Sequence, residues 1–139
     1  MCRQKIPIES YIGNNEKILV IDDEETQREV SCEMLEKLGY IADSVSSGQE
    51  AVEYLKDKPA DIIMLDMILS GNMNGLETYQ EIIRRHPDQK ALIISGFAET
   101  DEVREAQKLG AGAYVRKPYT IETLGMAIRK ELRRNPDNC

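Results

Sequence analysis

Five short apolar runs along the chain are each followed by a stretch whose apolar residues recur at helical spacing. The runs are Ile18–Ile21, Tyr40–Val45, Ile62–Leu65, Ala91–Ile94 and Ala113–Val115. The helical stretches are marked by Val30, Met34 and Leu38, by Ala51, Val52 and Leu55, by Leu76, Tyr79 and Ile83, by Val103 and Ala106, and by Ile121, Leu124, Ile128 and Leu132. Strands that alternate with helices predict an α/β fold, in which a parallel sheet carries helices on both faces.

The order of the strands is predicted from the polarity of the second run, Tyr40–Val45. This run contains Asp43 and Ser44 and is the most polar of the five, which suits a strand at the edge of a sheet. Of the two common doubly wound orders, the flavodoxin-like order 2-1-3-4-5 places the second strand at an edge. We therefore expect a doubly wound, five-stranded parallel sheet.

Turn-forming residues indicate where the helices and the domain end. Gly39 and Gly110 follow the first and fourth helical stretches, at positions where a left-handed residue is favoured. Asn135-Pro136 stops the last helix. The polar lead "MCRQKIPIESYIGNNE" ahead of the first strand predicts a linker or tether over residues 1–16. One domain is then expected over residues 17–134, with a short tail over residues 135–139.

The composition restricts the partners and the cellular compartment that we expect. A formal net charge of −7 argues against direct nucleic-acid binding, and no apolar run is long enough to span a membrane. Cys2, Cys32 and Cys139 are odd in number and widely spaced, so neither a disulfide framework nor a zinc site is indicated. We expect a cytoplasmic protein that contacts no membrane.

Polar residues follow the four apolar runs that the order 2-1-3-4-5 makes neighbours. They are Asp22 and Asp23 after the first run, Asp66 after the third, Ser95 after the fourth and Lys117 after the fifth. The carboxyl ends of parallel strands form the ligand-binding edge of such a sheet, so these side chains are expected to meet there.

Three carboxylates at one place repel each other unless a cation offsets their charge, and oxygen ligands suit Mg²⁺. A metal, a lysine and a hydroxyl around one carboxylate form a phosphoryl-transfer site. Each residue also has an ordinary structural explanation. Asp22 or Asp23 could cap a helix, Asp66 and Ser95 could lie in turns, and Lys117 could be a solvated charge.

Together, these motifs resemble the receiver domain of two-component response regulators over about residues 17–134. The match consists of the acidic pair, the lone aspartate of "IIMLD", the serine of "LIIS" and the Lys-Pro of "YVRKP". The resemblance implies a phosphoacceptor switch rather than an enzyme. Asp66 would accept phosphate from a phosphohistidine on a histidine kinase or a histidine phosphotransfer protein.

The resemblance also implies a role for each residue around Asp66. Asp23, Asp66 and the backbone carbonyl of Ile68 would ligate Mg²⁺, with Asp22 helping through water. Lys117 would contact the phosphoryl group through its ammonium, and a cis peptide bond is expected between it and Pro118.

The same resemblance implies a two-residue switch and a pair of positions that affect dephosphorylation. Ser95 would move to bind the phosphoryl group, and Tyr114 would then turn inward. Ile68 and Phe97 stand two residues past Asp66 and Ser95, and neither can orient a water for hydrolysis. A persistent phosphoryl group is therefore expected.

The loop after Asp66 departs from the usual pattern. It reads "MILSGNMNG", whereas receivers usually have a methionine-proline turn and reach the glycine one residue sooner. Ser70 and Gly71 replace that proline and lengthen the loop. The longer loop, the segments "GLETYQEI" and "LGAGAYVRKPYTIETLG", and the lead "ESYIGNNEKILVIDD" look most like the C-terminal receivers of hybrid sensor histidine kinases.

Two alternatives remain at the level of sequence. One is a stand-alone single-domain response regulator. Both this regulator and a hybrid-kinase receiver could form a weak homodimer. The other is a haloacid-dehalogenase-type phosphatase, but its nucleophile motif is Asp-x-Asp, whereas Asp22 and Asp23 are adjacent. That alternative also leaves Asp66 without a role.

Overall fold

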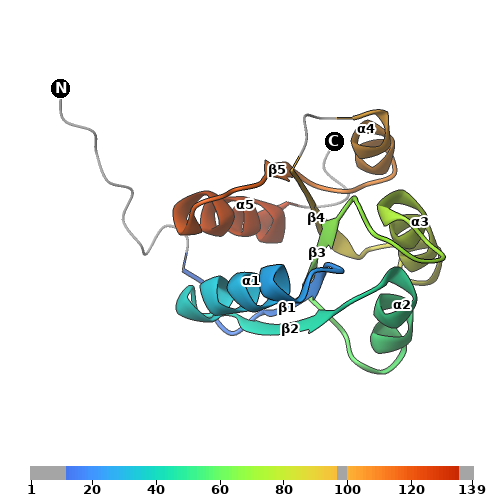
Figure 1. The fold of residues 1–139 in the computed structure, drawn as a ribbon. Helices are drawn as coiled ribbons and strands as arrows, with labels where there is room; N and C mark the ends of the chain where they lie inside the picture. Colours follow the sequence, from blue (N-terminus) through green and yellow to red (C-terminus); the bar gives the residue numbers. More distant parts are fainter. Residues whose placement is uncertain (1–11, 97–99, 135–139) are drawn as a thin grey trace.

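The computed structural model describes residues 12–96 and 100–134. It contains five strands that alternate with five helices (Figure 1). The strands are β1 (Lys17–Ile21), β2 (Ile41–Val45), β3 (Ile62–Asp66), β4 (Lys90–Ser95) and β5 (Tyr114–Arg116). The helices are α1 (Glu25–Lys37), α2 (Gly48–Asp57), α3 (Gly75–Arg85), α4 (Asp101–Lys108) and α5 (Ile121–Arg133).

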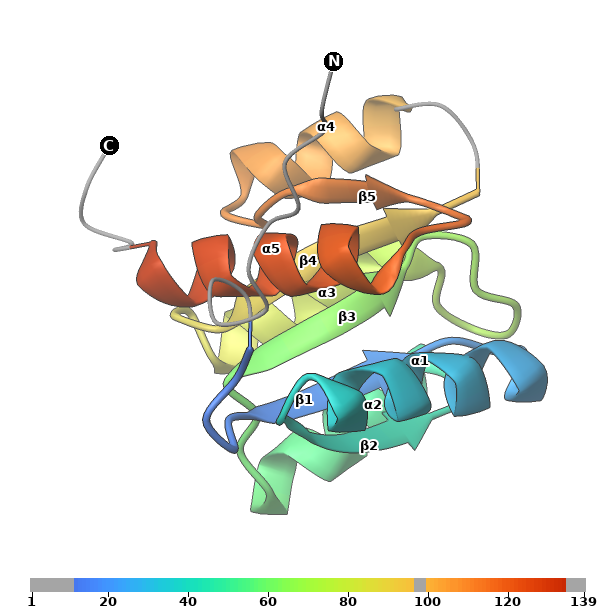
Figure 2. The ribbon, with the colours of Figure 1, turned by 90° about the vertical axis from the view of Figure 1, so that its left-hand side faces the viewer.

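The strands form one parallel sheet in the order β2-β1-β3-β4-β5, which confirms the predicted fold and strand order. β2 lies at an edge, as its polarity indicated. All strand arrows point the same way, so the carboxyl ends of the strands share one edge of the sheet (Figure 2).

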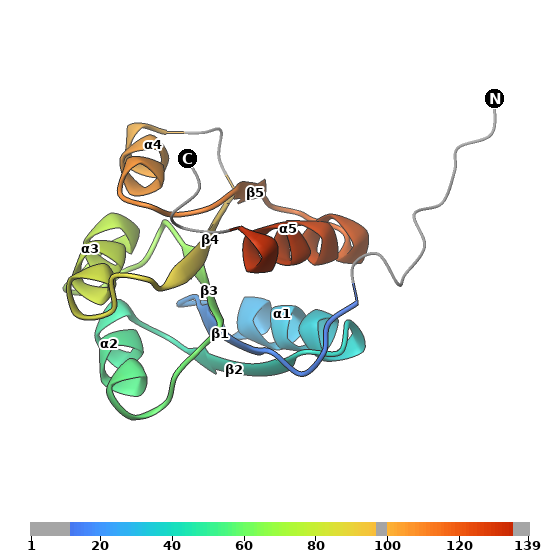
Figure 3. The same ribbon diagram turned by 180° about the vertical axis from the view of Figure 1, so that it is seen from behind.

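Helices cover both faces of the sheet. α1 and α5 lie on one face, and α2, α3 and α4 lie on the other (Figures 1 and 3). Successive strand residues point to opposite faces, so the two sides have separate cores. Facing α2–α4 are Leu19, Ile21, Ile63, Leu65, Ala91 and Ile93. Facing α1 and α5 are Ile18, Val20, Ile62, Met64, Leu92 and Ile94. Both alternating sets are buried, which explains why the strands read as unbroken apolar runs.

Local side-chain bonds set most helix starts. The side chains of Ser47, Asn74, Thr100 and Thr120 accept hydrogen bonds from backbone N–H groups of α2, α3, α4 and α5 respectively. Of the five helices in the described part of the chain, α1 is the one that begins without a side-chain cap. After α1 and α4, Gly39 and Gly110 have φ angles of 90° and 121°, as expected for glycines that end helices.

The predicted buried face of α1 is confirmed at Leu38, which is fully buried, and at Met34, which packs against the core, but not at Val30. Val30, which the periodicity places on the apolar face, has 42% of its surface exposed. The helix also buries Leu35 and the polar Ser31. Apolar spacing detects that a helix exists, but the burial of a serine depends on a partner from elsewhere in the chain.

Residues 12–16 precede β1 without forming a helix or a strand. The backbone N–H of Asn15 donates to the carbonyl of Gly39 over 2.8 Å, so this part of the predicted linker contacts the turn after α1. Among the described residues, none of the helices combines the length and the apolar composition that crossing a bilayer requires.

Candidate functional site

Three carboxylates meet at the carboxyl edge of the sheet. Asp22 and Asp23 directly follow β1, and Asp66 is the last residue of the neighbouring strand β3. One carboxylate oxygen from each residue lies within 4.8 Å of the other two. Asp22 and Asp66 are 4% and 7% exposed, whereas Asp23 is nearer to solvent. The structure therefore confirms that the three acidic side chains converge at this edge.

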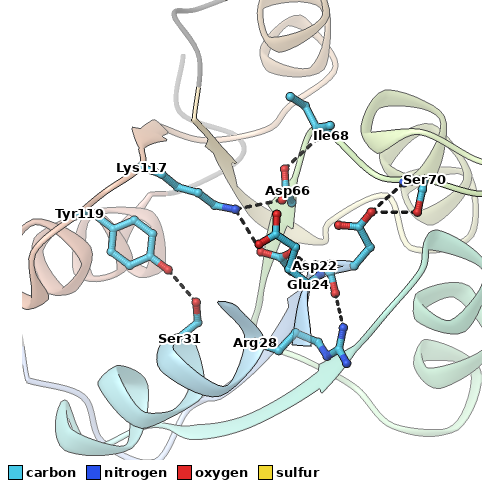
Figure 4. A network of polar contacts seen from close by, with 10 residues as sticks. Asp22, Glu24, Arg28, Ser31, Asp66, Ile68, Ser70, Lys117 and Tyr119 are labelled. Atoms are coloured by element: carbon cyan, nitrogen blue, oxygen red, sulfur yellow. Dashed lines mark hydrogen bonds and ion pairs between the residues drawn. The ribbon is translucent and has the colours of Figure 1, made fainter. Parts of the chain in front are cut away.

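Lys117 provides the positive charge of this site. Its Nζ atom lies 3.1 Å from Asp22 Oδ2 and 3.0 Å from Asp66 Oδ2 (Figure 4). Its backbone N–H donates to the carbonyl of Ser95 over 2.8 Å, which ties the end of β5 to the end of β4. The peptide bond to Pro118 is cis, as predicted. The solvated-charge explanation of Lys117 is wrong, because only 20% of its side chain is exposed.

Both oxygens of the Asp66 carboxylate accept hydrogen bonds. Oδ2 accepts from Lys117, and Oδ1 accepts from the backbone N–H of Ile68 over 2.8 Å. Burial raises the pKa of Asp66, and the bonds from Ile68 and Lys117 offset that rise only in part. Burial alone would lower the pKa of Lys117, but its bonds to Asp66 and Asp22 outweigh burial and raise it. Asp66 is thus a poorly solvated carboxyl group, and the ammonium of Lys117 beside it is held in its charged form by its bonds to Asp66 and Asp22.

Asp22 has a local structural role as well as its place in the site. Its Oδ1 accepts from the backbone N–H of Glu24 over 2.9 Å, just before α1 begins. The Asp22 carbonyl accepts from Arg28 Nη1 over 2.8 Å (Figure 4). Asp22 does not cap α1, because Glu24 is the N-cap residue and the helix has no side-chain cap. Its Oδ1 holds the turn before the helix while its Oδ2 bonds to Lys117.

The remaining predicted residues lie around this centre. Ser95 ends β4 and is 2% exposed, and Tyr114 begins β5, opposite Ile93, with a half-buried side chain. Ile68 lies two residues past Asp66 and is 52% exposed. Phe97 lies outside the described residues. The switching role of Ser95 and Tyr114 and the metal-ligating carbonyl of Ile68 stay predictions.

Two contacts of the site were not expected from the sequence. Ser70 donates to Asp23 Oδ2 from its hydroxyl over 2.8 Å and from its backbone N–H over 3.1 Å. The hydroxyls of Ser31 and Tyr119 lie 2.7 Å apart and link α1 to the segment after Lys117 (Figure 4). For Ser70, the sequence did carry a signal, namely a serine where a proline is usual, but it did not indicate which residue the serine contacts.

The family model described as the response regulator receiver domain matches residues 18–129. The chain belongs to this family. It is a receiver domain of the two-component type, and receivers act as phosphoacceptor switches rather than as enzymes. This assignment excludes the alternative of a haloacid-dehalogenase-type phosphatase.

Curated relatives and solved structures agree with the family. The chain is 30% identical over 118 residues to sporulation initiation phosphotransferase F of Bacillus subtilis, covering 85% of this chain and 94% of that protein. It is 30% identical over 115 residues to the chemotaxis protein CheY of Thermotoga maritima, covering 82% and 95%. The receiver domain of NtrX from Brucella abortus superposes with a TM-score of 0.80 at 26% identity, covering 85% and 99%. Some relatives are longer, and the chain spans only 24% of one of them.

Receivers bind Mg²⁺ at an acidic cluster, and the donors of this chain fit that ion. The cluster of Asp22, Asp23 and Asp66 offers only oxygen ligands, which suit a hard divalent cation. The single ammonium of Lys117 faces two of the three carboxylates, so the cluster keeps an excess of negative charge that a divalent ion would offset.

The raised pKa of Asp66 predicts how the stability of this receiver depends on pH without Mg²⁺. Between the ordinary and the raised pKa, the folded state holds more protons than the unfolded state, so stability falls as pH rises through that window. At pH values above the raised pKa, the ionised carboxylate of Asp66 lowers the free energy of unfolding. We therefore expect Asp66→Asn to melt at a higher temperature than the wild type in EDTA at pH 7.

Thermal unfolding followed by circular dichroism checks this expectation. The gap between the two proteins should close as pH falls below the pKa of Asp66. A variant that melts lower than the wild type at pH 7 would show that the paired, ionised form of Asp66 stabilises the fold.

Proposed function

We propose that Asp66 accepts a phosphoryl group from the phosphohistidine of a histidine kinase or a histidine phosphotransfer protein, with Mg²⁺ as cofactor. The observation that supports this proposal is the placement of Asp66. Its carboxylate lies between the ammonium of Lys117, the N–H of Ile68 and two further carboxylates. The proposed roles of Asp66 and its neighbours follow the family's pattern position by position.

In the transfer, one oxygen of Asp66 attacks phosphorus and forms an O–P bond. The N–P bond to the donor imidazole breaks, and its electron pair stays on the nitrogen. The Lys117 ammonium, now 3.0 Å from Asp66 Oδ2, is placed to pair with the oxygens of the incoming group. When bound, Mg²⁺ supplies positive charge beside those oxygens. We propose Asp23, Asp66 and the carbonyl of Ile68 as its ligands, with Asp22 acting through water.

The proposed switch lies on the β4–β5 side of the site. Ser95 would bind the phosphoryl group and Tyr114 would turn inward, which alters the surface of α4, β5 and α5. Candidates on that surface include Asp101, Glu102 and Arg104, all exposed, and Arg104 pairs with Asp101 over 2.7 Å. Glu99, a further candidate, lies outside the described residues.

For its setting, we propose the receiver of a hybrid sensor histidine kinase, on the basis of its lengthened loop after Asp66. Two relatives above are matched over almost their whole length, and this observation supports a second candidate, a stand-alone receiver. Both settings are cytoplasmic, with a phosphohistidine protein as partner and a possible weak homodimer. Neither involves contact with nucleic acid or a membrane.

The test is the intact mass after incubation with Mg²⁺ and acetyl phosphate. We expect the wild type to gain one phosphoryl group, and Asp66→Asn or added EDTA to abolish the gain. The variant should stay folded, since an amide replaces a carboxylate of the same shape. A folded wild type that gains no group, or an Asp66→Asn variant that gains one, would refute the proposal.

A further inference from the structure

Ser70 places two hydrogen-bond donors on one oxygen of Asp23. Its hydroxyl lies 2.8 Å and its backbone nitrogen 3.1 Å from Asp23 Oδ2, and the two residues are 47 positions apart in the chain. A carboxylate oxygen has about two lone-pair sites. Ser70 therefore occupies the hydrogen-bonding capacity of Oδ2 and leaves Oδ1 as the oxygen that is available for a cation.

The loop that carries Ser70 is held on both sides of it. Leu69 is 8% exposed and packs into the core beneath α2–α4. Gly71 has a φ angle of 99°, which favours glycine and turns the chain sharply after Ser70. Asn74 then starts α3 in a capping box with Glu77. The position of Ser70 is thus set by the loop as a whole.

A proline at this position, usual in receivers, could make neither bond. Proline has no backbone N–H and no hydroxyl. The contact between the loop and Asp23 is therefore particular to a receiver with serine here, and the charge on Asp23 strengthens both bonds relative to neutral ones.

We infer that Ser70 is a positioning residue for the metal site: it orients the Asp23 carboxylate so that Oδ1 faces the ion, and it couples the loop between β3 and α3 to metal binding. The inference rests on the proposed function, because it assigns Asp23 as a ligand. Removing a group that hydrogen-bonds to a metal-ligating side chain typically weakens metal affinity by roughly 10–100-fold. Ser70 lies at the exposed rim, so a smaller effect is expected.

The experiment is a Mg²⁺ titration by ¹⁵N–¹H NMR without a phosphoryl donor, which measures binding rather than activity. Ser70→Ala removes the hydroxyl and keeps the N–H, so we expect the dissociation constant to rise about threefold. Ser70→Pro removes both donors, and we expect a rise of about tenfold. Ser70→Thr keeps both and should stay within about twofold of the wild type. Asn72→Ala, an exposed change in the same loop, is the matched control.

The rate of phosphoryl uptake at saturating Mg²⁺ distinguishes a loss of Asp23 positioning from a general loss of structure. At saturating Mg²⁺, Ser70→Ala should take up phosphate from acetyl phosphate at the wild-type rate, with only its Mg²⁺ requirement raised. Melting in EDTA checks that each variant is folded, and if Ser70→Pro is not, Ser70→Ala decides the test.

The outcomes distinguish this inference from the proposed function. Unchanged Mg²⁺ affinity in Ser70→Ala, or an equal loss in Asn72→Ala, would overturn the role of Ser70 and leave the phosphoacceptor proposal intact. A wild type that binds no Mg²⁺ at millimolar concentration would overturn both.

Discussion

Lys117→Met is expected to lower the free energy of unfolding by about 3–5 kcal/mol without Mg²⁺ at neutral pH, the usual cost of removing one partner of a buried ion pair. The Lys117 ammonium bonds to Asp22 and Asp66, whose side chains are only 5% and 9% exposed. Methionine keeps the length of the side chain, so the change removes charge and little packing. Two buried carboxylates are then left facing each other without a cation.

Two additions should restore part of the lost stability of Lys117→Met. Mg²⁺ offsets the same carboxylates, and Asp66→Asn removes one of them. The quantity to measure is the free energy of unfolding in urea, with and without Mg²⁺, for the single and the double variants.

The matched control for Lys117→Met is Lys56→Met. Lys56 also pairs with a carboxylate, Glu53 at 2.8 Å, but both side chains are exposed. We expect that change to cost less than about 1 kcal/mol. A cost for Lys117→Met as small as that of the control would mean that the carboxylates of the site are solvated, contrary to their burial.

Gly75→Ala is expected to destabilise the fold by about 3 kcal/mol or more, at the upper end of overpacking costs. A Cβ atom on Gly75 would lie 2.5 Å from the Cα of Met67, 2.7 Å from its carbonyl oxygen and 2.9 Å from the carbonyl oxygen of Asp66. All three are backbone atoms, which no rotamer change can move. Either α3 shifts away from the sheet or the segment after Asp66 is displaced.

Because that segment carries the N–H of Ile68 that bonds to Asp66, the damage should reach the site. We expect Gly75→Ala to lose phosphoryl uptake in the intact-mass assay as well as stability in urea. Gly96→Ala is the control for stability, since a Cβ on Gly96 would meet nothing within 4 Å. If Gly75→Ala matches the stability and uptake of the wild type, close packing of α3 on this segment is not needed.

Much of the site was predictable because it depends on strand ends. Parallel strands bring their carboxyl ends to one edge, so the order 2-1-3-4-5 and the residues after each run already placed Asp22, Asp66 and Lys117 together. The structure bears this out with the contacts of about 3 Å from Lys117 to both aspartates. The helix ends at Gly39 and Gly110 could also be predicted, since a positive φ at a helix end favours glycine whatever the surroundings.

The errors and omissions concern side chains whose partners come from distant segments. Val30 fits the apolar spacing of α1 yet is exposed, while the polar Ser31 is buried because its hydroxyl meets Tyr119, 88 positions later. In the same way, nothing near Asp23 indicated that Ser70 would bond to it.

Residue patterns along the chain were enough to predict the strand–helix alternation, the parallel sheet and the charged residues at its edge, since these depend on periodicity and on position along a strand. The structure was needed to show that α1 buries Ser31 rather than Val30, how Lys117 divides its bonds between two carboxylates and which loop residue bonds to Asp23. These features depend on contacts between segments far apart in the chain, and side-chain periodicity carries no information about such contacts.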